Sequence, residues 1–523
     1  MHTTNQGASV MRNPSTPDIT EADALPASPE PVARRKAFLA VMVGCAALVF
    51  GLGASLNLAI GRIATSPLHP SATAVLWIVD TYLVVFGCLL IPAGAIGDRY
   101  GRKQTMLAGL ALLAFGSLLS AAAAGVPALL VGRAAAGAGA ALILPNSLAL
   151  LVQVYPPHQK SHAIAMWTAM TGLGGALGNI LGGLVLQFAQ WQAIFTVAVP
   201  LALAGLVLTA WLAPRLAGHE HPLDLIGAAI LMLGIFSLLT GLIEGQELGW
   251  LSAKVIGAFC LSGLFLAIFV WMEAKRKHPL LDPGIFRARG LCAGMLGMAV
   301  SFIGMYSMFY LNGQYLMSIK GYPPALAGLA ILPLVAVVFW VSPRSIRLAQ
   351  RIGPRPVVAA GLVALVAGLG LLRHCGTDSP YWFFALSIGV VGMGSGLSNP
   401  LLSSAIIGSL PPRQAGVGAG INSFTREIGG ALGIALFGSL LATTFPSRLP
   451  PALAQAPGAT TQSIGAALAY ARSTPGLSSQ IPAVRQAFVA ATAQSLLLVM
   501  LVLAVAVILV TLWYPASAKA TEK

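Results

Sequence analysis

Charged side chains are scarce in this chain. Only 9% of its 523 residues are Asp, Glu, Lys or Arg, and 57% are hydrophobic, whereas soluble proteins carry about 25% charged residues. The mean hydropathy is +0.83. This composition excludes an ordinary soluble domain and predicts an integral membrane protein that exposes its apolar surface to lipid. Long apolar runs with few charges indicate membrane-spanning helices, so the fold class is all-α.

Cysteine is also rare, and motifs for a metal or a cofactor are missing. The five cysteines (Cys45, Cys88, Cys260, Cys292 and Cys375) are scattered without the spacing of a metal site or a disulfide framework. The glycine-rich stretches 392–396 and 416–420 follow no strand, and no Walker-type sequence occurs. We therefore expect no metal, no cofactor and no coupling to ATP. No Ser/His/Asp arrangement supports an enzyme.

Acidic residues are half as frequent as basic ones, 15 against 30, which gives a net charge of +15. A basic balance can indicate a nucleic-acid partner. Here most of the Lys and Arg residues fall in tails and alternate loops, which is the positive-inside pattern of a membrane protein. We expect lipid and not nucleic acid as the partner, with both termini in the cytoplasm.

The apolar runs predict fourteen spanning helices. Their ranges are 38–60, 74–94, 105–124, 127–151, 163–186, 193–212, 224–243, 255–272, 291–316, 324–342, 357–372, 382–408, 418–441 and 487–513. Residues 1–36, rich in Pro, Ser, Thr and acids, are expected to be a disordered cytoplasmic tail. Residues 444–484 are expected to form a long external loop, and 515–523 a second cytoplasmic tail.

The chain repeats itself at an offset of 255 residues. Gly139 and Pro145 recur as Gly394 and Pro400, and the Pro-Pro-x-Gln sequence at 156–159 recurs at 411–414. Gly174-Gly-Ala-Leu-Gly178 recurs as Gly429-Gly-Ala-Leu-Gly433. This predicts two similar halves, 37–213 and 290–514, of six helices each. The intervening residues 214–289 hold two extra helices and a cytoplasmic loop.

Few charges lie inside the predicted spans. They are Asp80 in the second, Arg133 in the fourth, and Arg426 and Glu427 in the thirteenth. A charge inside the bilayer is costly, so such residues face an aqueous cavity or a partner. Burial favours the protonated form of a carboxyl group, which makes Asp80 and Glu427 candidate proton carriers. Structural pairing is the alternative for both, because Arg426 or an arginine of a loop could simply neutralise Glu427. Arg133 is a candidate for a proton relay or for a structural cation.

A tight, charged turn lies between the second and third predicted spans. It reads Gly94-Ala-Ile-Gly-Asp98-Arg99-Tyr-Gly101-Arg102-Lys103. This sequence resembles the loop between the second and third helices of the major facilitator superfamily. A weaker echo, Arg351-Ile-Gly353-Pro-Arg355, has Gln350 in place of Asp98. The resemblance implies two six-helix halves, and a loop that acts as a conformational latch on the cytoplasmic side.

A second motif lies in the fifth predicted span, as Gly174-Gly-Ala-Leu-Gly178-Asn179-Ile-Leu-Gly182-Gly183. Glycines at this spacing predict close helix packing. The stretch also resembles the fifth-helix motif of antiporters in this superfamily, with Asn179 where that family has Pro.

Further elements resemble the fourteen-helix drug:proton antiporters of this superfamily, especially exporters of quaternary ammonium compounds. They are Trp77-Ile-Val-Asp80-Thr-Tyr82, Arg133 followed by Gly137, Trp191-x-x-Ile-Phe195, and His278-Pro-Leu-Leu-Asp282. The first helix departs from the family, because no Asp precedes Asn57-Leu-Ala59. Asp80 and Glu427 would then carry more of the cation recognition and proton coupling.

The resemblance implies proton-coupled efflux of amphipathic, cationic drugs or biocides, with the proton gradient as energy source. Short loops and the absence of targeting signals are typical of a bacterial cytoplasmic membrane protein, and we expect a monomer. Aromatic faces suit lipophilic cations, and core packing is the alternative for each ring. Candidate pocket residues are Asn57, Tyr82, Trp167, Tyr306, Tyr310, Asn312, Gln314 and Asn422. Two other functions stay open: a dedicated exporter of one endogenous metabolite, such as an antibiotic or siderophore, and a non-transporting membrane sensor. The missing Asp favours neutral or anionic cargo.

Overall fold

The computed structural model describes residues 32–56, 72–214, 224–276, 283–410, 415–454 and 464–515, with a few single positions between 59 and 68. In these residues, fourteen helices are long and apolar enough to cross a membrane, which confirms the predicted all-α membrane fold. Many large apolar side chains are exposed on the outer helices, among them Phe115, Trp211 and Trp340. Such a surface is stable only in contact with lipid.

The first half of the chain contributes six long helices. They are α1 (Val32–Ser55), α3 (Ala72–Tyr100), α4 (Arg102–Ala121), α5 (Val126–Val154), α6 (Pro157–Phe188) and α7 (Ala193–Leu212). They enclose a core that is built almost wholly from their own apolar side chains and is joined by Ile407 and Ala419 from the second half. Because α1 begins at Val32, the basic residues Arg34 and Arg35 lie in its first turns and not in a tail.

The second half starts at α10 (Arg289–Gln314), which runs into a π-helical turn, η4 (Tyr315–Ile319). The other helices of this half are α11 (Pro324–Leu329), α12 (Leu332–Ile352), α13 (Pro354–Leu372), α14 (Tyr381–Gly408), α15 (Ala415–Thr444) and α19 (Ile481–Trp513). The span predicted at 324–342 is thus made of α11 and α12 together, with a break at Ala330. The two halves meet along the helix pairs α3–α15 and α6–α12.

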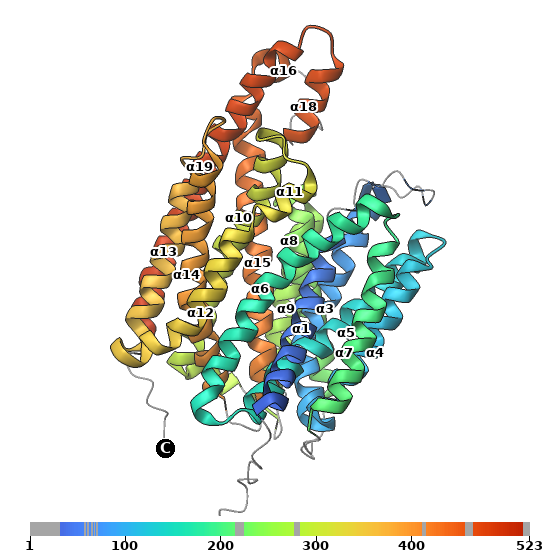
Figure 1. Ribbon diagram of the computed structural model, residues 1–523, viewed down its shortest axis with the longest axis vertical. Helices are drawn as coiled ribbons and strands as arrows, with labels where there is room; N and C mark the ends of the chain where they lie inside the picture. The colour runs from blue at the N-terminus through green and yellow to red at the C-terminus, as the bar shows by residue number, and fades with distance from the viewer. Residues whose placement is uncertain are drawn as a thin grey trace, which may run out of the picture.

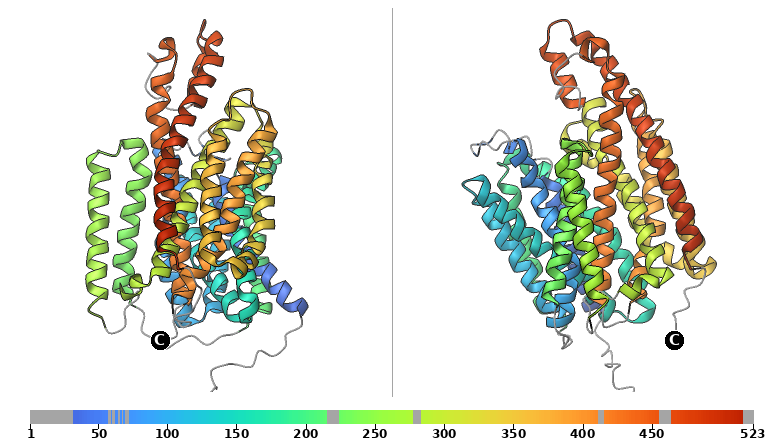
Figure 2. Two further views of the ribbon diagram at one scale, coloured as in Figure 1. Left: turned by 90° about the vertical axis from the view of Figure 1, so that its left-hand side faces the viewer. Right: turned by 180° about the vertical axis from the view of Figure 1, so that it is seen from behind.

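Two extra helices, α8 (Leu225–Leu248) and α9 (Ala253–Glu273), form a hairpin at the edge of the bundle (Figure 2). The α8 helix packs on α3 and α15, whereas most of α9 faces outward. The N-cap Asp224 accepts a hydrogen bond from the Gly227 amide and pairs with Arg276 at the far end of the hairpin. The short helix η3 (Pro283–Arg287) then leads into α10.

The segment expected to be an external loop is largely structured. It contains η6 (Pro446–Arg448), α16 (Pro451–Ala454), α18 (Ile464–Ser473) and η7 (Ser478–Gln480), and α19 begins at Ile481. The α18 helix buries Ile464, Ala467, Leu468 and Ala471, a spacing that forms one apolar face, and it packs on α19 and η4. This cap lies at the end of the bundle opposite to the start of α1 and the end of α19 (Figure 1).

Candidate functional site

The motif between the second and third spans joins the two halves. Here α3 continues through Asp98 and Arg99 and ends at Tyr100, so the stretch expected to be a turn is mostly helical. The turn itself is Gly101, whose φ of 96° is a conformation that side chains disfavour. Gly94 is buried within α3. No residue between Gly94 and Tyr100 breaks the helix, and the chain reverses only where a positive φ allows it.

Both carboxylate oxygens of Asp98 accept hydrogen bonds. Its Oδ1 accepts hydrogen bonds from Nε and Nη2 of Arg102, at 3.0 and 2.8 Å. Its Oδ2 accepts the backbone amide of Val417, in the first turn of α15, at 3.2 Å. A carboxylate at a helix N-terminus is stabilised by the unpaired amides and the helix dipole. Asp98 therefore links the first half to the second.

Basic residues of the motif cap a neighbouring helix. Lys103 Nζ donates to the carbonyl oxygens of Ala210 and Ala213 at the end of α7, at 2.7 and 2.6 Å. The echo in the second half repeats this geometry, because Gly353 has a φ of 91° and Arg355 Nε donates to Thr511 O of α19 at 2.6 Å. The repeat seen in the sequence is thus reproduced in the backbone.

A residue that the sequence reasoning missed supports the motif from α5. Asn146 is fully buried, and its Nδ2 donates to Ala93 O of α3 at 3.2 Å and to Leu142 O at 2.8 Å. A Cβ on Gly97 would overlap this side chain. Asn146 follows Pro145 inside a predicted span. This position could have identified it as a structural residue, because a polar amide in the membrane needs a partner.

Arg133 lies inside the first half. Its Nε donates to Ile78 O at 2.9 Å and its Nη2 to Val79 O at 3.1 Å. The guanidinium carbon lies 4.6 Å from the centre of the Tyr82 ring, and the side chain interacts electrostatically with Asp80 on the same stretch of α3. Arg133 thus ties α5 to α3 next to the candidate proton carrier Asp80, which is half-buried.

Arg426 and Glu427 lie on α15 at the boundary between the halves. Arg426 is 1% exposed and donates through Nη2 to Thr171 Oγ1 of α6. Glu427 interacts electrostatically with Arg426 and Tyr306, and its Oε1 is buried without a hydrogen-bond partner in the described structure. These two neighbours form no ion pair within the described residues. Their charges still attract each other, so the proton-carrier and the structural-pairing interpretations of Glu427 both stay predictions.

The structure separates the predicted pocket residues. Trp167 and Tyr306 lie close to Arg426, and Asn422 lies one helical turn before it. Tyr82 is buried in the first half with its hydroxyl on Val49 O, and it interacts electrostatically with Glu427 across the boundary. Three residues lie along α10: Tyr310 against Phe437, buried Asn312, and Gln314. Asn57 lies outside the described residues. Phe50, Phe302 and Thr171, which the sequence reasoning missed, complete the surroundings of Arg426.

The glycine motif of α6 packs directly on α1. A Cβ on Gly174 would lie 2.7 Å from the Cα of Ala47, and one on Gly178 would overlap the backbone of Gly51. In the second half, a Cβ on Gly429 would lie 2.8 Å from the carbonyl oxygen of Ala299 of α10. Both halves use the same glycine contact. Gly182 packs on Ser55, and Asn179 lies near Gly328 of α11. Gly183 is the last glycine of the motif, on the same helix.

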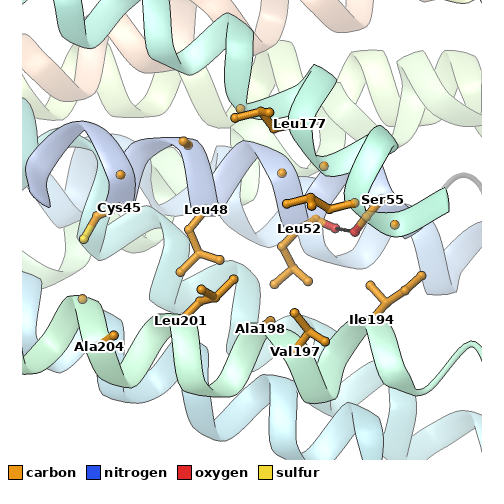
Figure 3. Close-up of a pocket in the computed structure, with 18 of the residues that line it drawn as sticks. Cys45, Leu48, Leu52, Ser55, Leu177, Ile194, Val197, Ala198, Leu201 and Ala204 are labelled. Carbon is orange, nitrogen blue, oxygen red and sulfur yellow. Dashed lines mark hydrogen bonds between the residues drawn. The ribbon is translucent and has the colours of Figure 1, made fainter. Parts of the chain in front are cut away.

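Two cavities differ in place and size. One of about 450 Å³ lies between α1, α6 and α7 and is lined almost entirely by apolar groups. Leu48 and Leu52 of α1 lie across from Val197 and Leu201 of α7 (Figure 3). The other, of about 20 Å³, touches Arg426, Thr168, Phe302 and Asn399 between the halves. Drug-sized ligands need about 300 Å³ or more, so the centre is closed in this conformation.

Comparison with known proteins agrees with this geometry. The sequence profile of the Major Facilitator Superfamily matches residues 39–434 and 294–522. The fold is similar to that of a bacterial homologue of the human lysosomal transporter Spinster, in an inward-facing, unoccupied conformation. The TM-score is 0.58 at 16% identity, and the match covers 92% of this chain and 98% of that one.

Curated relatives are more similar in sequence. The multidrug resistance protein Stp of Mycobacterium tuberculosis is 32% identical over 73% of this chain and 71% of its own. The multidrug efflux pump LfrA of Mycolicibacterium smegmatis is 31% identical, over 84% of this chain and 89% of its own. The tetracenomycin C resistance and export protein of Streptomyces glaucescens is 32% identical, over 74% and 73%. The chain therefore belongs to the major facilitator superfamily, among its drug-resistance and efflux transporters.

Proposed function

We propose that this protein exports lipophilic drugs or biocides from the bacterial cytoplasm in exchange for protons, as a monomer in the inner membrane and without a bound cofactor. The observation that carries the proton coupling is Glu427. It has a carboxylate oxygen buried without a hydrogen-bond partner in the described structure, and it lies where the two halves meet. A proton on this oxygen removes a buried charge, so protonation changes the energy of the closed centre.

The proton site and the cargo site act on one conformational equilibrium. A ligand or proton shifts that equilibrium only by its different affinity for the two states. Glu427 is half-buried in the conformation described here, with its Oε1 shielded from solvent, and it gains contact with water when the halves separate. Proton binding from outside then favours one state, and cargo binding from inside favours the other.

The Asp98 motif acts as the cytoplasmic latch. Asp98 contacts the start of α15 across the boundary between the halves, so it stabilises the state in which the cytoplasmic ends are closed. Opening toward the cytoplasm breaks this bond to α15. Arg99 at the end of α3 belongs to the same charged group.

Efflux from energised cells tests the proposal. We expect cells that express the protein to accumulate less of a lipophilic drug, and a protonophore to abolish the difference. Glu427→Gln should remove the gradient-driven efflux, and Asp80→Asn should reduce it if that carboxylate shares the coupling. The matched control is Asp378→Asn, because Asp378 is an exposed carboxylate outside the spans. Efflux that is indifferent to the protonophore and to both carboxylates would refute proton coupling.

A dedicated export role is the second candidate. The relatives include both multidrug resistance proteins and the tetracenomycin C resistance and export protein. The buried donors of Arg426 and Asn422, which have no partner in the described structure, favour a cargo with matching acceptors. A competition panel separates the two, because a broad exporter is inhibited by many unrelated drugs and a dedicated one by few.

A further inference from the structure

The guanidinium of Arg426 has unused donors in a buried place. The side chain is 1% exposed, and only Nη2 makes a hydrogen bond, to Thr171. Nε and Nη1 have no partner in the described part of the chain. Arginine presents five N–H donors in a planar fork, and a buried donor without a partner costs free energy. A ligand with suitably placed acceptors would remove this cost.

Aromatic rings enclose this guanidinium from both halves. The guanidinium carbon lies 4.6 Å from the ring centre of Phe302 on α10, 5.3 Å from that of Phe50 on α1 and 5.6 Å from that of Trp167 on α6. Ring faces attract the positive charge but cannot accept the fork of N–H groups as two oxygen atoms can. The rings also form flat, apolar walls against which a planar molecule packs.

A second unpaired polar group lies one helical turn away. Asn422 and Arg426 are four residues apart on α15, so they share one face of the helix. Asn422 is fully buried, and neither its Oδ1 nor its Nδ2 has a partner in the described structure. Glu427 points in a different direction from Arg426, because adjacent residues on a helix do not face each other. The face shared by Asn422 and Arg426 therefore offers donors and one fixed positive charge.

We propose that Arg426 and Asn422 form the recognition site for cargo that is flat, apolar and equipped with neighbouring oxygen acceptors, such as a carboxylate or a dicarbonyl. This inference rests on the proposed export function and names its substrate class. A pair of oxygens accepts the Nε and Nη1 hydrogens in the bidentate geometry that guanidinium groups favour. A quaternary ammonium group has no acceptor for the free N–H groups of the guanidinium. The cationic cargo expected from the sequence is therefore not the class that this site selects.

Equilibrium binding to the purified, full-length protein in lipid nanodiscs tests the proposal. The two probes are naphthalene carboxylate and naphthylmethyl trimethylammonium, which share one ring system and differ in the polar group. Quenching of tryptophan fluorescence reports binding, because Trp167 lies beside Arg426. We expect the carboxylate to bind about tenfold to a hundredfold more tightly, as hydrogen bonds to a charged group provide. Equal binding of the two probes, or tighter binding of the ammonium, would overturn the proposal.

Three variants locate the site. Arg426→Lys keeps the charge but loses the fork, so it should weaken carboxylate binding about tenfold or more. Asn422→Ala leaves the guanidinium in place and should weaken carboxylate binding by a smaller factor. If Arg426→Lys does not fold, the Asn422→Ala variant tests the proposal. The control Arg344→Gln removes an exposed arginine of α12 and should bind as the wild type. Unchanged carboxylate affinity in folded Arg426→Lys and Asn422→Ala would contradict the proposed site.

Binding of the probes needs no proton gradient, so the result of the binding experiment is independent of the result of the efflux experiment. A protein that binds the carboxylate through Arg426 but shows no protonophore-sensitive efflux would refute the coupling and keep the recognition site. A protein with protonophore-sensitive efflux that binds the ammonium probe more tightly would refute the recognition site and keep the proton coupling.

Discussion

Arg426 donates a hydrogen bond to Thr171, and the two residues stand 255 positions apart, which is the offset of the internal repeat. They therefore occupy equivalent places in the two halves. In transporters built from parallel repeats, the halves are related by an axis along the membrane normal. Equivalent residues can touch only if they lie beside that axis. Arg426 thus marks the centre of the molecule, where the halves meet and a cargo site is expected.

Loss of the Thr171 hydroxyl should destabilise the closed centre. Thr171→Ala leaves Nη2 of a buried guanidinium without its acceptor, which costs about 1–3 kcal/mol. Thermal unfolding of the purified protein in detergent measures this as a lower Tm. The control is Thr196→Ala, since Thr196 is exposed on α7 and bonds only within its own helix. An equal loss of Tm in the two variants would contradict the central role of the bond.

The glycine contact between α1 and α6 should tolerate no side chain. Gly178→Val places atoms into the backbone of Gly51, and the overlap should cost at least about 2 kcal/mol because packed cores yield little. Folded yield by size-exclusion chromatography and Tm measure the loss. Gly44→Ala on α1 is the matched control, because no atom lies within 4 Å of its added Cβ. Normal folding of Gly178→Val would show that the two helices can separate at no cost.

Asp98→Asn should weaken the cytoplasmic latch. The substitution removes the charge that pairs with Arg102 and that the α15 N-terminus stabilises. We expect the cytoplasmic ends of the halves to open more often. Ile407, at the end of α14, is buried against the core of the first half, so a single cysteine there in a cysteine-free background reports the opening. Its labelling by a hydrophilic maleimide should rise severalfold in Asp98→Asn, and equal rates would contradict the latch.

The open end of the α8–α9 hairpin, where Asp224 lies, should contribute less to the stability of the fold at acid pH. Burial alone raises the pKa of Asp224, but the neighbouring Glu273, the hydrogen bond from the Gly227 amide and the ion pair with Arg276 outweigh burial and hold that pKa below its ordinary value. Asp224 therefore stabilises the fold at pH values above the ordinary Asp pKa of about 3.9, and this contribution is lost as the pH falls through the lower, folded-state pKa.

Thermal unfolding at a series of pH values checks this sign. Asp224→Asn should lower Tm near neutral pH, and the difference from the wild type should shrink as the pH falls below about 4. Glu244→Gln, on the same helix, should show no such trend. A difference that stays constant down to low pH would mean that Asp224 acts through packing and not through its charge.

The sequence predicted the elements better than their ends. Apolar length located every span, because a helix in lipid must bury its own backbone groups and needs about 20 apolar residues. It misplaced the end of α3, since hydropathy falls at Asp98 while the helix continues to Tyr100. It also missed the small helices between α15 and α19, of which α18 has a short apolar face that packs on α19 and η4.

The sequence by itself determined the membrane fold, the repeat and the few charges inside the spans, because each of these is a property of composition or spacing. Only the tertiary structure decided which charges meet. It placed Arg133 on the carbonyls of Ile78 and Val79, and Arg426 on Thr171 among three rings. Neighbours in sequence such as Arg426 and Glu427 point apart on a helix, whereas residues 255 positions apart touch because the two halves fold around one axis.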